Sequence, residues 1–146
     1  IELAIPERGQ IADLTAEFPD AELVFDDYNE RVKLENDEFL VSGFYSGDNK
    51  ENYYSILFTT TNPKYAPTMR GITIGCRYID VISRFTTNPP DEIEIGHCIY
   101  GGADMVDSHA YVGEESISFF DGQTGIVIMY YFDDNGLVEC VRWFQV

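Results

Sequence analysis

Short runs of apolar and β-branched residues, separated by turn residues, dominate the hydrophobic pattern of the chain. Such runs, bounded by Gly, Pro, Asn or Asp, are typical of β-strands. The pattern predicts strands over residues 22–28, 31–35, 39–45, 53–60, 92–100, 115–120, 125–132 and 137–144. The dipeptide Asn135-Gly136 between the last two runs indicates a tight hairpin.

One segment, RGITIGCRYIDVISRF (70–85), has the spacing of an amphipathic helix. An apolar, strand-like run over 72–74 meets Gly75, which allows a tight turn into a helix over 75–85. The predicted apolar face consists of Tyr78, Ile79, Ile82 and Phe85. A second short helix is expected over 11–18, and the proline-rich connector 61–71 is expected to contain neither helix nor strand.

The order of strands, a helix and more strands predicts an α+β fold, an antiparallel β-sheet packed by a short helical unit. The length of 146 residues fits one domain, 1–146. FDDYN at 25–29 resembles FDDNG at 132–136. This echo has two explanations: two related halves, 1–62 and 63–146, or two hairpins that use the same turn residues.

The formal charge of −17 makes nucleic acids and anionic membrane surfaces unfavourable partners, because both are negatively charged. High charge also favours solubility. An acidic, cation-binding protein is an alternative explanation of the same composition. No apolar run is long enough for a transmembrane segment. Residue 1 is Ile, which has two explanations: a signal or anchor segment was removed, or the sequence was trimmed.

The cysteines, Cys76, Cys98 and Cys140, form no C-x-x-C motif, and we expect three reduced thiols. A Cys98–Cys140 disulfide is the alternative if their strands are neighbours. His97 and Cys98 are adjacent in a predicted strand, so their side chains point to opposite faces. His109 could meet Cys98 or Cys76 only through the fold. We therefore assign no catalytic residue.

Asp104, Asp107 and His109 lie in GGADMVDSHAY (101–111), which we expect to be a flexible, solvated loop. Their spacing matches no established ligand motif. The turn at 133–136 lacks the alternating ligands of a calcium loop. We expect neither a metal site nor a cofactor.

Basic residues concentrate in one segment, which contains Lys64, Arg70, Arg77 and Arg84. Arg70, Arg77 and Arg84 are candidates for a docking face on an acidic body. The alternative is a solvated helix face on which Asp80 pairs with Arg77 and Arg84.

Gly71-Ile72-Thr73-Ile74-Gly75, then Asp80-Val81-Ile82 and Phe85, resembles an element of small extracytoplasmic proteins of Gram-positive bacteria, many of them lipoproteins of unknown function. It is also similar to the helical element of the β-lactamase-inhibitor-protein-like and outer-membrane-assembly-lipoprotein (SmpA/OmlA) folds. YYFDDNGLVECVRW (130–143) resembles their final hairpin. The resemblance covers residues 70–146. Cys76 departs from the small polar or acidic residue usual there, and the first 60 residues contain no second copy of the motif.

The resemblance implies an extracytoplasmic, non-enzymatic binding domain, secreted or envelope-anchored. Its partner would be another protein or a cell-envelope component, recognised by the open sheet face or the helix–loop edge. Candidate aromatic anchors are Tyr45, Tyr53, Tyr54, Tyr100, Tyr111 and Tyr130. The alternatives are a small Cys/His-dependent hydrolase, using Cys98 or Cys76 with His109, and the acidic cation-binding protein.

Overall fold

A computed structural model describes residues 1–89, 94–101 and 107–146. The strands are β1 (Arg8–Gln10), β2 (Glu22–Asp26), β3 (Arg31–Glu35), β4 (Phe39–Ser46), β5 (Asn52–Thr60), β6 (Cys98–Tyr100), β7 (His109–Gly113), β8 (Ser116–Asp121), β9 (Ile126–Phe132) and β10 (Val138–Gln145). The helices are α1 (Ile11–Glu17) and α2 (Tyr78–Ser83). The described residues thus form mostly antiparallel sheet with few helices, as predicted.

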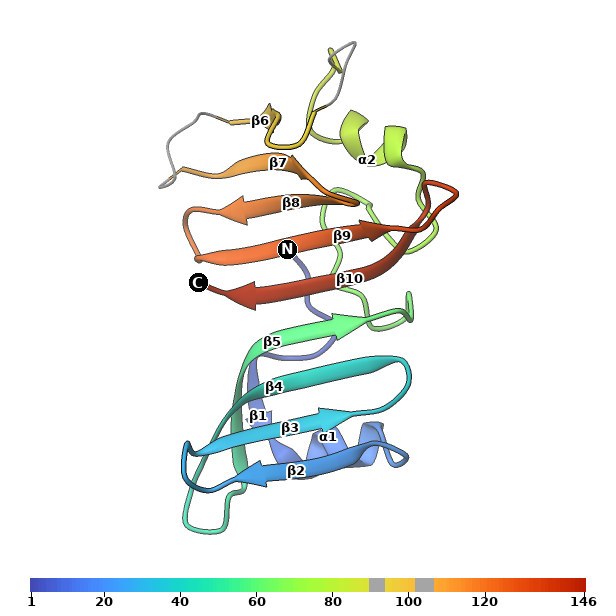
Figure 1. Ribbon diagram of the computed structural model, residues 1–146. Helices are drawn as coiled ribbons and strands as arrows, with labels where there is room; N and C mark the ends of the chain where they lie inside the picture. The colour runs from blue at the N-terminus through green and yellow to red at the C-terminus, as the bar shows by residue number, and fades with distance from the viewer. Residues whose placement is uncertain (90–93, 102–106) are drawn as a thin grey trace.

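The strands form one antiparallel sheet with the order β2-β3-β4-β5-β10-β9-β8-β7-β6, and β1 also pairs with β5 (Figure 1). The strands of residues 1–62 therefore lie on one side of the β5–β10 pair, and those of residues 63–146 lie on the other. At this central seam Thr60 lies opposite Val141, and Leu57 lies opposite Phe144. Backbone pairing between two strands distant in sequence makes the sheet continuous.

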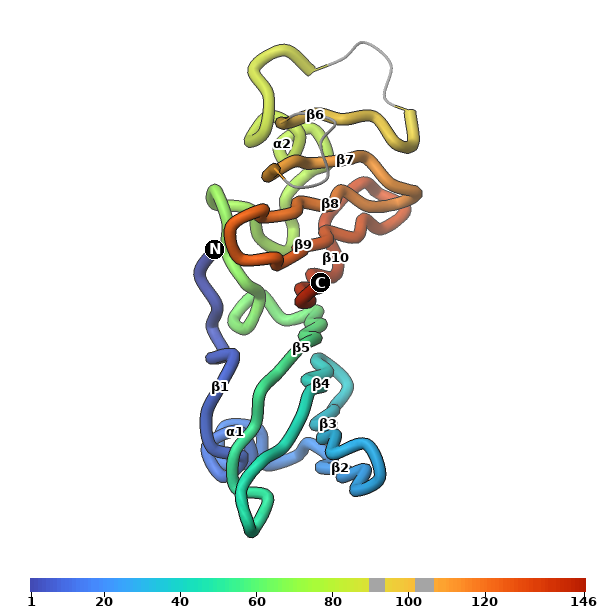
Figure 2. Tube along the Cα trace, turned by 90° about the vertical axis from the view of Figure 1, so that its left-hand side faces the viewer, coloured from blue at the N-terminus to red at the C-terminus, as the bar shows by residue number. Residues whose placement is uncertain are grey.

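Both helices lie on the same side of the sheet, which is the side of the hydrophobic core (Figure 2). Trp143 and Phe58 face each other across the β5–β10 seam and are almost fully buried. Helix α2 contributes Val81 and Ile82 to this core. The predicted helical face was wrong in one residue, because Ile79 is 46% exposed. The helix begins only at Tyr78, and it packs on the sheet with the edge that carries residues 81 and 82.

The run 72–74 was predicted to be strand-like, and the structure corrects this: it lies in turns, with an isolated bridge between Met69 and Ile72. The N–H of Gly75 donates to the carbonyl of Val138 (2.8 Å), and the N–H of Val138 donates to the carbonyl of Cys76 (2.9 Å). Gly75 has a φ of +93°, so the expected tight turn is present. The stretch therefore docks on the final hairpin instead of entering the sheet.

Strand β7 was missed, because its residues were predicted to belong to a flexible loop. In HAYVG (109–113) the core-facing Ala110 and Val112 alternate with His109 and Tyr111, which lie on the other face of the strand. The polar residues that precede this strand obscured the alternation. The strand predicted over 92–100 is observed only as β6, and residues 90–93 lie outside the described part. The remaining predicted strands agree with the observed ones to within two residues at each end.

The two FDD turns share a local mechanism. Oδ1 of Asp26 accepts the N–H of Tyr28 (3.1 Å), and Oδ1 of Asp133 accepts the N–H of Asn135 (2.9 Å). One turn joins β2 to β3, the first strand pair of its half, whereas the other joins β9 to β10, the last pair of its half. Turn chemistry accounts for the local similarity of the two segments, and the two related halves, 1–62 and 63–146, stay a prediction.

Candidate functional site

The face of strands β7, β8, β9 and β10 that points away from the helices is the candidate site. We call it the open face. Its residues follow from the strand register: β7 contributes His109, Tyr111 and Gly113; β8 contributes Ser116, Ser118 and Phe120; β9 contributes Val127, Met129 and Tyr131; β10 contributes Cys140, Arg142 and Phe144. The alternate residues of these strands pack into the core. No described helix covers the open face (Figures 1 and 2).

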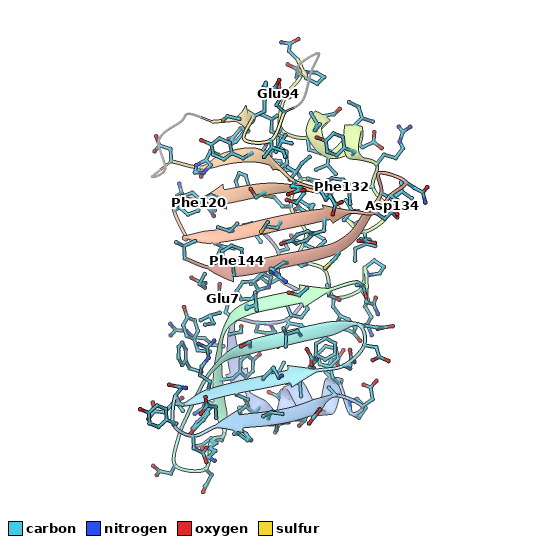
Figure 3. The ribbon with its side chains drawn as sticks, viewed as in Figure 1. Glu7, Glu94, Phe120, Phe132, Asp134 and Phe144 are labelled. Carbon is cyan, nitrogen blue, oxygen red and sulfur yellow. The ribbon has the colours of Figure 1, made fainter. Side chains whose placement is uncertain are left out.

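One row of the open face is continuous and, apart from His109, apolar; we call it the apolar row. It consists of His109, Phe120, Val127, Phe144 and, across the seam on β5, Leu57, each paired with the next in the register. Figure 3 labels Phe120 and Phe144, which lie toward the same end of β8 and β10. All members except the buried His109 are half-buried. A connected apolar patch on an uncovered face is typical of an interaction surface.

A groove of about 460 Å³ lies at the β7–β9 end of this row. Its lining residues are His109, Tyr111, Ser118, Phe120, Val127 and Val146. The imidazole of His109 packs edge-on against Tyr111 (4.8 Å between ring centroids) and tilts against Phe120 (5.2 Å). Its Nδ1 lies 2.7 Å from the carbonyl oxygen of Asp107. These contacts hold the His109 ring in place, so the groove has a fixed aromatic wall.

Arg142 supplies the positive charge of the open face. Its Nε donates to Oγ1 of Thr59 (3.2 Å), and its guanidinium lies 5.7 Å from the ring centroid of Tyr131. It is also the only basic residue after position 84 in the sequence. The Arg142 side chain is thus fixed beside the apolar row.

The open face contains no Asp or Glu at its paired positions, although the chain has 26 acidic residues and a net charge of −17. Aromatic residues, Met and Arg are enriched in the cores of protein interfaces, and Asp and Glu are depleted there. The open face has this composition, with Tyr111, Phe120, Met129, Arg142 and Phe144.

Of the three arginines proposed as a docking face, Arg70 makes contacts within the fold. The Arg70 guanidinium lies over the rings of Tyr100 (4.5 Å) and Phe85 (5.1 Å), and its Nη1 donates to the carbonyl of Arg84 (2.9 Å). Arg70 therefore fastens the end of α2 to the sheet. It is engaged in the fold.

Arg77 forms the predicted ion pair, with Nε 3.0 Å and Nη2 3.2 Å from the two carboxylate oxygens of Asp80. This hydrogen-bonded pair lowers the pKa of Asp80. Among the ion pairs of the described residues, none includes Arg84. A docking role for Arg77 and Arg84 stays a prediction.

The tyrosines proposed as exposed anchors are less accessible than expected. Tyr53 and Tyr130 are buried, and Tyr45, Tyr54, Tyr100 and Tyr111 are half-buried. The alternation of residues along a strand could not predict which tyrosines are exposed, because the face that each strand buries depends on its neighbours. Tyr28, which the sequence pattern did not single out as an anchor, is 95% exposed in the β2–β3 turn. Of the proposed anchors, only Tyr111 lies in the open-face groove.

The thiols are free, and none is arranged with His109 as a nucleophile–base pair. Sγ of Cys98 donates to the carbonyl of Tyr100 (3.1 Å), and no hydrogen bond joins any described cysteine to His109. Cys98 is on β6 and Cys140 is on β10, with three strands between them. The alternative of a Cys98–Cys140 disulfide was therefore wrong.

The described residues contain no cluster of three or more His, Cys, Asp or Glu side chains that could bind a metal ion. Asp104, one of the proposed loop carboxylates, lies outside the described residues. No helix in the described ranges is both long and apolar enough to cross a bilayer.

No family model and no curated protein matches the chain. Among solved structures, it is similar to a cysteine-rich secretory protein from Staphylococcus aureus, with a TM-score of 0.46 and 16% sequence identity. The alignment covers 93% of this chain and 42% of that chain, so the matched region spans less than half of the Staphylococcus protein. A likeness at this level does not assign the chain to a family.

Proposed function

We propose that this chain is a non-catalytic binding domain of an exported or envelope-anchored protein, and that it recognises another protein through the open face. The observation that carries the proposal is that the paired positions of the described β7–β10 face contain aromatic residues and no Asp or Glu, in a protein with a net charge of −17. Elsewhere the acidic surface repels other acidic surfaces. Contact through the open face removes few charged groups from water, so the desolvation cost of binding is lower there than on the acidic surface.

The proposal also includes a fold family and a cellular location. A β-lactamase-inhibitor-protein-like fold is supported by the order of a short helix followed by antiparallel strands. It is also supported by the contact between the 70–85 stretch and the final hairpin. Export and envelope anchoring rest on the sequence resemblance of residues 70–146.

Site-specific photo-crosslinking tests the open face. Benzoylphenylalanine replaces Phe120, Phe144 or, as a control, Phe44, which is 39% exposed on β4 outside the open face. Each variant is irradiated in a cell-envelope extract of the source organism. We expect one crosslinked protein from positions 120 and 144 that excess unlabelled protein displaces, and we expect that the variant Phe120→Ser does not displace it. Equal crosslinking from position 44, or none from position 120, would contradict the proposal.

Thiol labelling tests the hydrolase alternative. Without a neighbouring base or cation, a thiol stays protonated at neutral pH and reacts slowly. We expect slow iodoacetamide labelling of Cys76, Cys98 and Cys140 in the native protein, measured by mass spectrometry from pH 6 to 9. The pKa of Cys140 is raised by burial, so this thiol is expected to need the highest pH. Fast labelling of Cys98 at pH 6 would favour an enzyme.

A further inference from the structure

Strand β2 is an unpaired edge of the sheet, at the end opposite the open face (Figure 1). Its five residues, ELVFD, alternate between exposed and half-buried positions. Glu22, Val24 and Asp26 are exposed, and Leu23 and Phe25 face the core side. An edge of this kind can accept a further strand by backbone hydrogen bonding.

The register identifies the backbone groups that are available at this edge. In an antiparallel ladder, consecutive residues of a strand direct their N–H and C=O groups to opposite sides. The N–H of Tyr45 donates to the carbonyl of Glu30 (3.1 Å), so even-numbered residues of β3 pair with β4. Odd-numbered residues of β3 therefore pair with Glu22, Val24 and Asp26. The N–H and C=O groups of Leu23 and Phe25 point outward.

The exposed side chains of β2 define the charge that an added strand would meet. Glu22 lies directly opposite Glu35 on β3, a like-charge pair that is unfavourable. Asp26 lies opposite Arg31, but the Arg31 guanidinium lies over the ring of Phe44 (5.1 Å). The ion pairs of the described residues include neither Glu22 nor Asp26.

The Asp26 carboxylate accepts hydrogen bonds from Asn29 and Tyr28, which lower its pKa. Lys33 lies opposite Val24, between the two acidic positions. A cation beside Glu22 and Asp26 would give each carboxylate a direct ion pair, which none of the described residues supplies.

The same charges disfavour a second copy of this chain. Antiparallel self-pairing about Val24 would align the outward groups of Leu23 and Phe25 correctly, but it would place Glu22 opposite Asp26 of the second copy, twice. Like charges directly opposite each other destabilise a strand pair. The edge thus carries the kind of charged residues that block self-association.

We propose that β2 binds an extended basic segment of a partner protein as an added antiparallel strand. Its alternate residues are Lys or Arg, an apolar residue, and Lys or Arg, placed opposite Asp26, Val24 and Glu22. Val24 is 41% exposed and supplies the central apolar contact. Hydrogen bonds to Leu23 and Phe25 fix the register. This surface is separate from the open face and does not depend on its function.

Three synthetic peptides test the proposal. The probe is Thr-Lys-Thr-Val-Thr-Lys-Thr; one control has Glu in place of both Lys, and another has the same composition with the two Lys adjacent. Amide NMR spectra and hydrogen exchange of the ¹⁵N-labelled protein are recorded with each peptide. We expect the probe alone to shift the β2 resonances and to slow exchange at the amides of Leu23 and Phe25. Equal effects from the adjacent-Lys peptide, or no added protection, would overturn the proposal.

Matched charge variants separate local from overall charge. Glu22→Gln with Asp26→Asn is expected to weaken probe binding by about tenfold, in the range of two exposed ion pairs. Asp134→Asn with Glu139→Gln removes the same charge from exposed positions far along the sheet and is expected to leave binding unchanged. Equal weakening by both pairs would overturn the proposal. A wild-type dimer formed through β2, detected by analytical ultracentrifugation and by protection of the same amides, would also overturn it.

Discussion

Two buried tyrosines differ in how their hydroxyls are satisfied. The hydroxyl of Tyr53 donates to the carbonyl of Pro6 (3.0 Å), whereas the hydroxyl of Tyr130 has no partner among the described residues. Burial raises the pKa of both side chains, because the phenolate form would lose its hydration. A buried hydroxyl without a partner costs free energy that a hydrogen-bonded one recovers.

The same substitution should therefore have opposite effects at the two positions. We expect Tyr130→Phe to raise the free energy of unfolding by about 1 kcal/mol and Tyr53→Phe to lower it by about 1 kcal/mol. Urea denaturation at pH 7 measures both. If Tyr130→Phe destabilised the protein as much as Tyr53→Phe does, the Tyr130 hydroxyl would have a partner after all.

A raised tyrosine pKa also determines how stability depends on pH. Burial favours the neutral phenol in the folded state. The contribution of each buried tyrosine to the free energy of unfolding is therefore complete below the pKa of an unfolded tyrosine, about 10, and is lost as the pH rises above it. We expect the stability of the wild type to fall from pH 9 to 11 more steeply than that of Tyr130→Phe. Urea midpoints over this range measure the difference, and identical slopes would contradict it.

At the scale of elements, α2 is too short to be stable alone and depends on its contacts with the sheet. Arg70 supplies one of these contacts, because its guanidinium caps the carbonyl of Arg84 and lies over Phe85 and Tyr100. The two basic residues that the sequence grouped together thus have different roles. Arg70 is structural, and the side chain of Arg84 is exposed.

Alanine substitutions should separate these roles. We expect Arg70→Ala to lower the free energy of unfolding by about 1–2 kcal/mol, the sum of a hydrogen bond and a cation–π contact. Arg84→Ala removes the same charge and should change it by less than about 0.5 kcal/mol. Thermal and urea unfolding, followed by circular dichroism, measure both variants. Equal losses would contradict the assigned role of Arg70.

At the scale of the whole molecule, the net charge of −17 is spread over a sheet whose open face has no Asp or Glu at the paired positions of its described strands. Self-repulsion among exposed carboxylates destabilises the folded state, and salt screens it. The open face and the acidic β2 edge lie at opposite ends of the sheet order. The molecule therefore offers two surfaces of different chemistry to its surroundings.

Screening should stabilise the protein. We expect the melting temperature to rise by about 3 °C between ~20 mM and ~500 mM NaCl, which corresponds to roughly 1 kcal/mol. Calcium chloride at matched ionic strength is the control, because a specific calcium site would add stabilisation at low concentrations. A melting temperature that does not rise with NaCl would contradict the prediction. Stabilisation by micromolar calcium alone would favour the cation-binding alternative.

The sequence by itself determined the local elements of this protein. Strand 31–35 and the hairpin at Asn135-Gly136 follow from alternation and from turn residues that require no distant partner. Alternation was weak in β7 and Ile79 was assigned to the wrong face, because burial depends on what packs against a segment. Local pattern therefore gave the fold class but not every element.

Only the tertiary structure decided which strands are neighbours and which face stays open. The apolar row joins Leu57 to His109, Phe120, Val127 and Phe144, residues that approach one another only because β5 pairs with β10. A shift of one residue in any of these pairings would move the row into the core. Composition fixed the excess of carboxylates, and the strand register decided where they are absent.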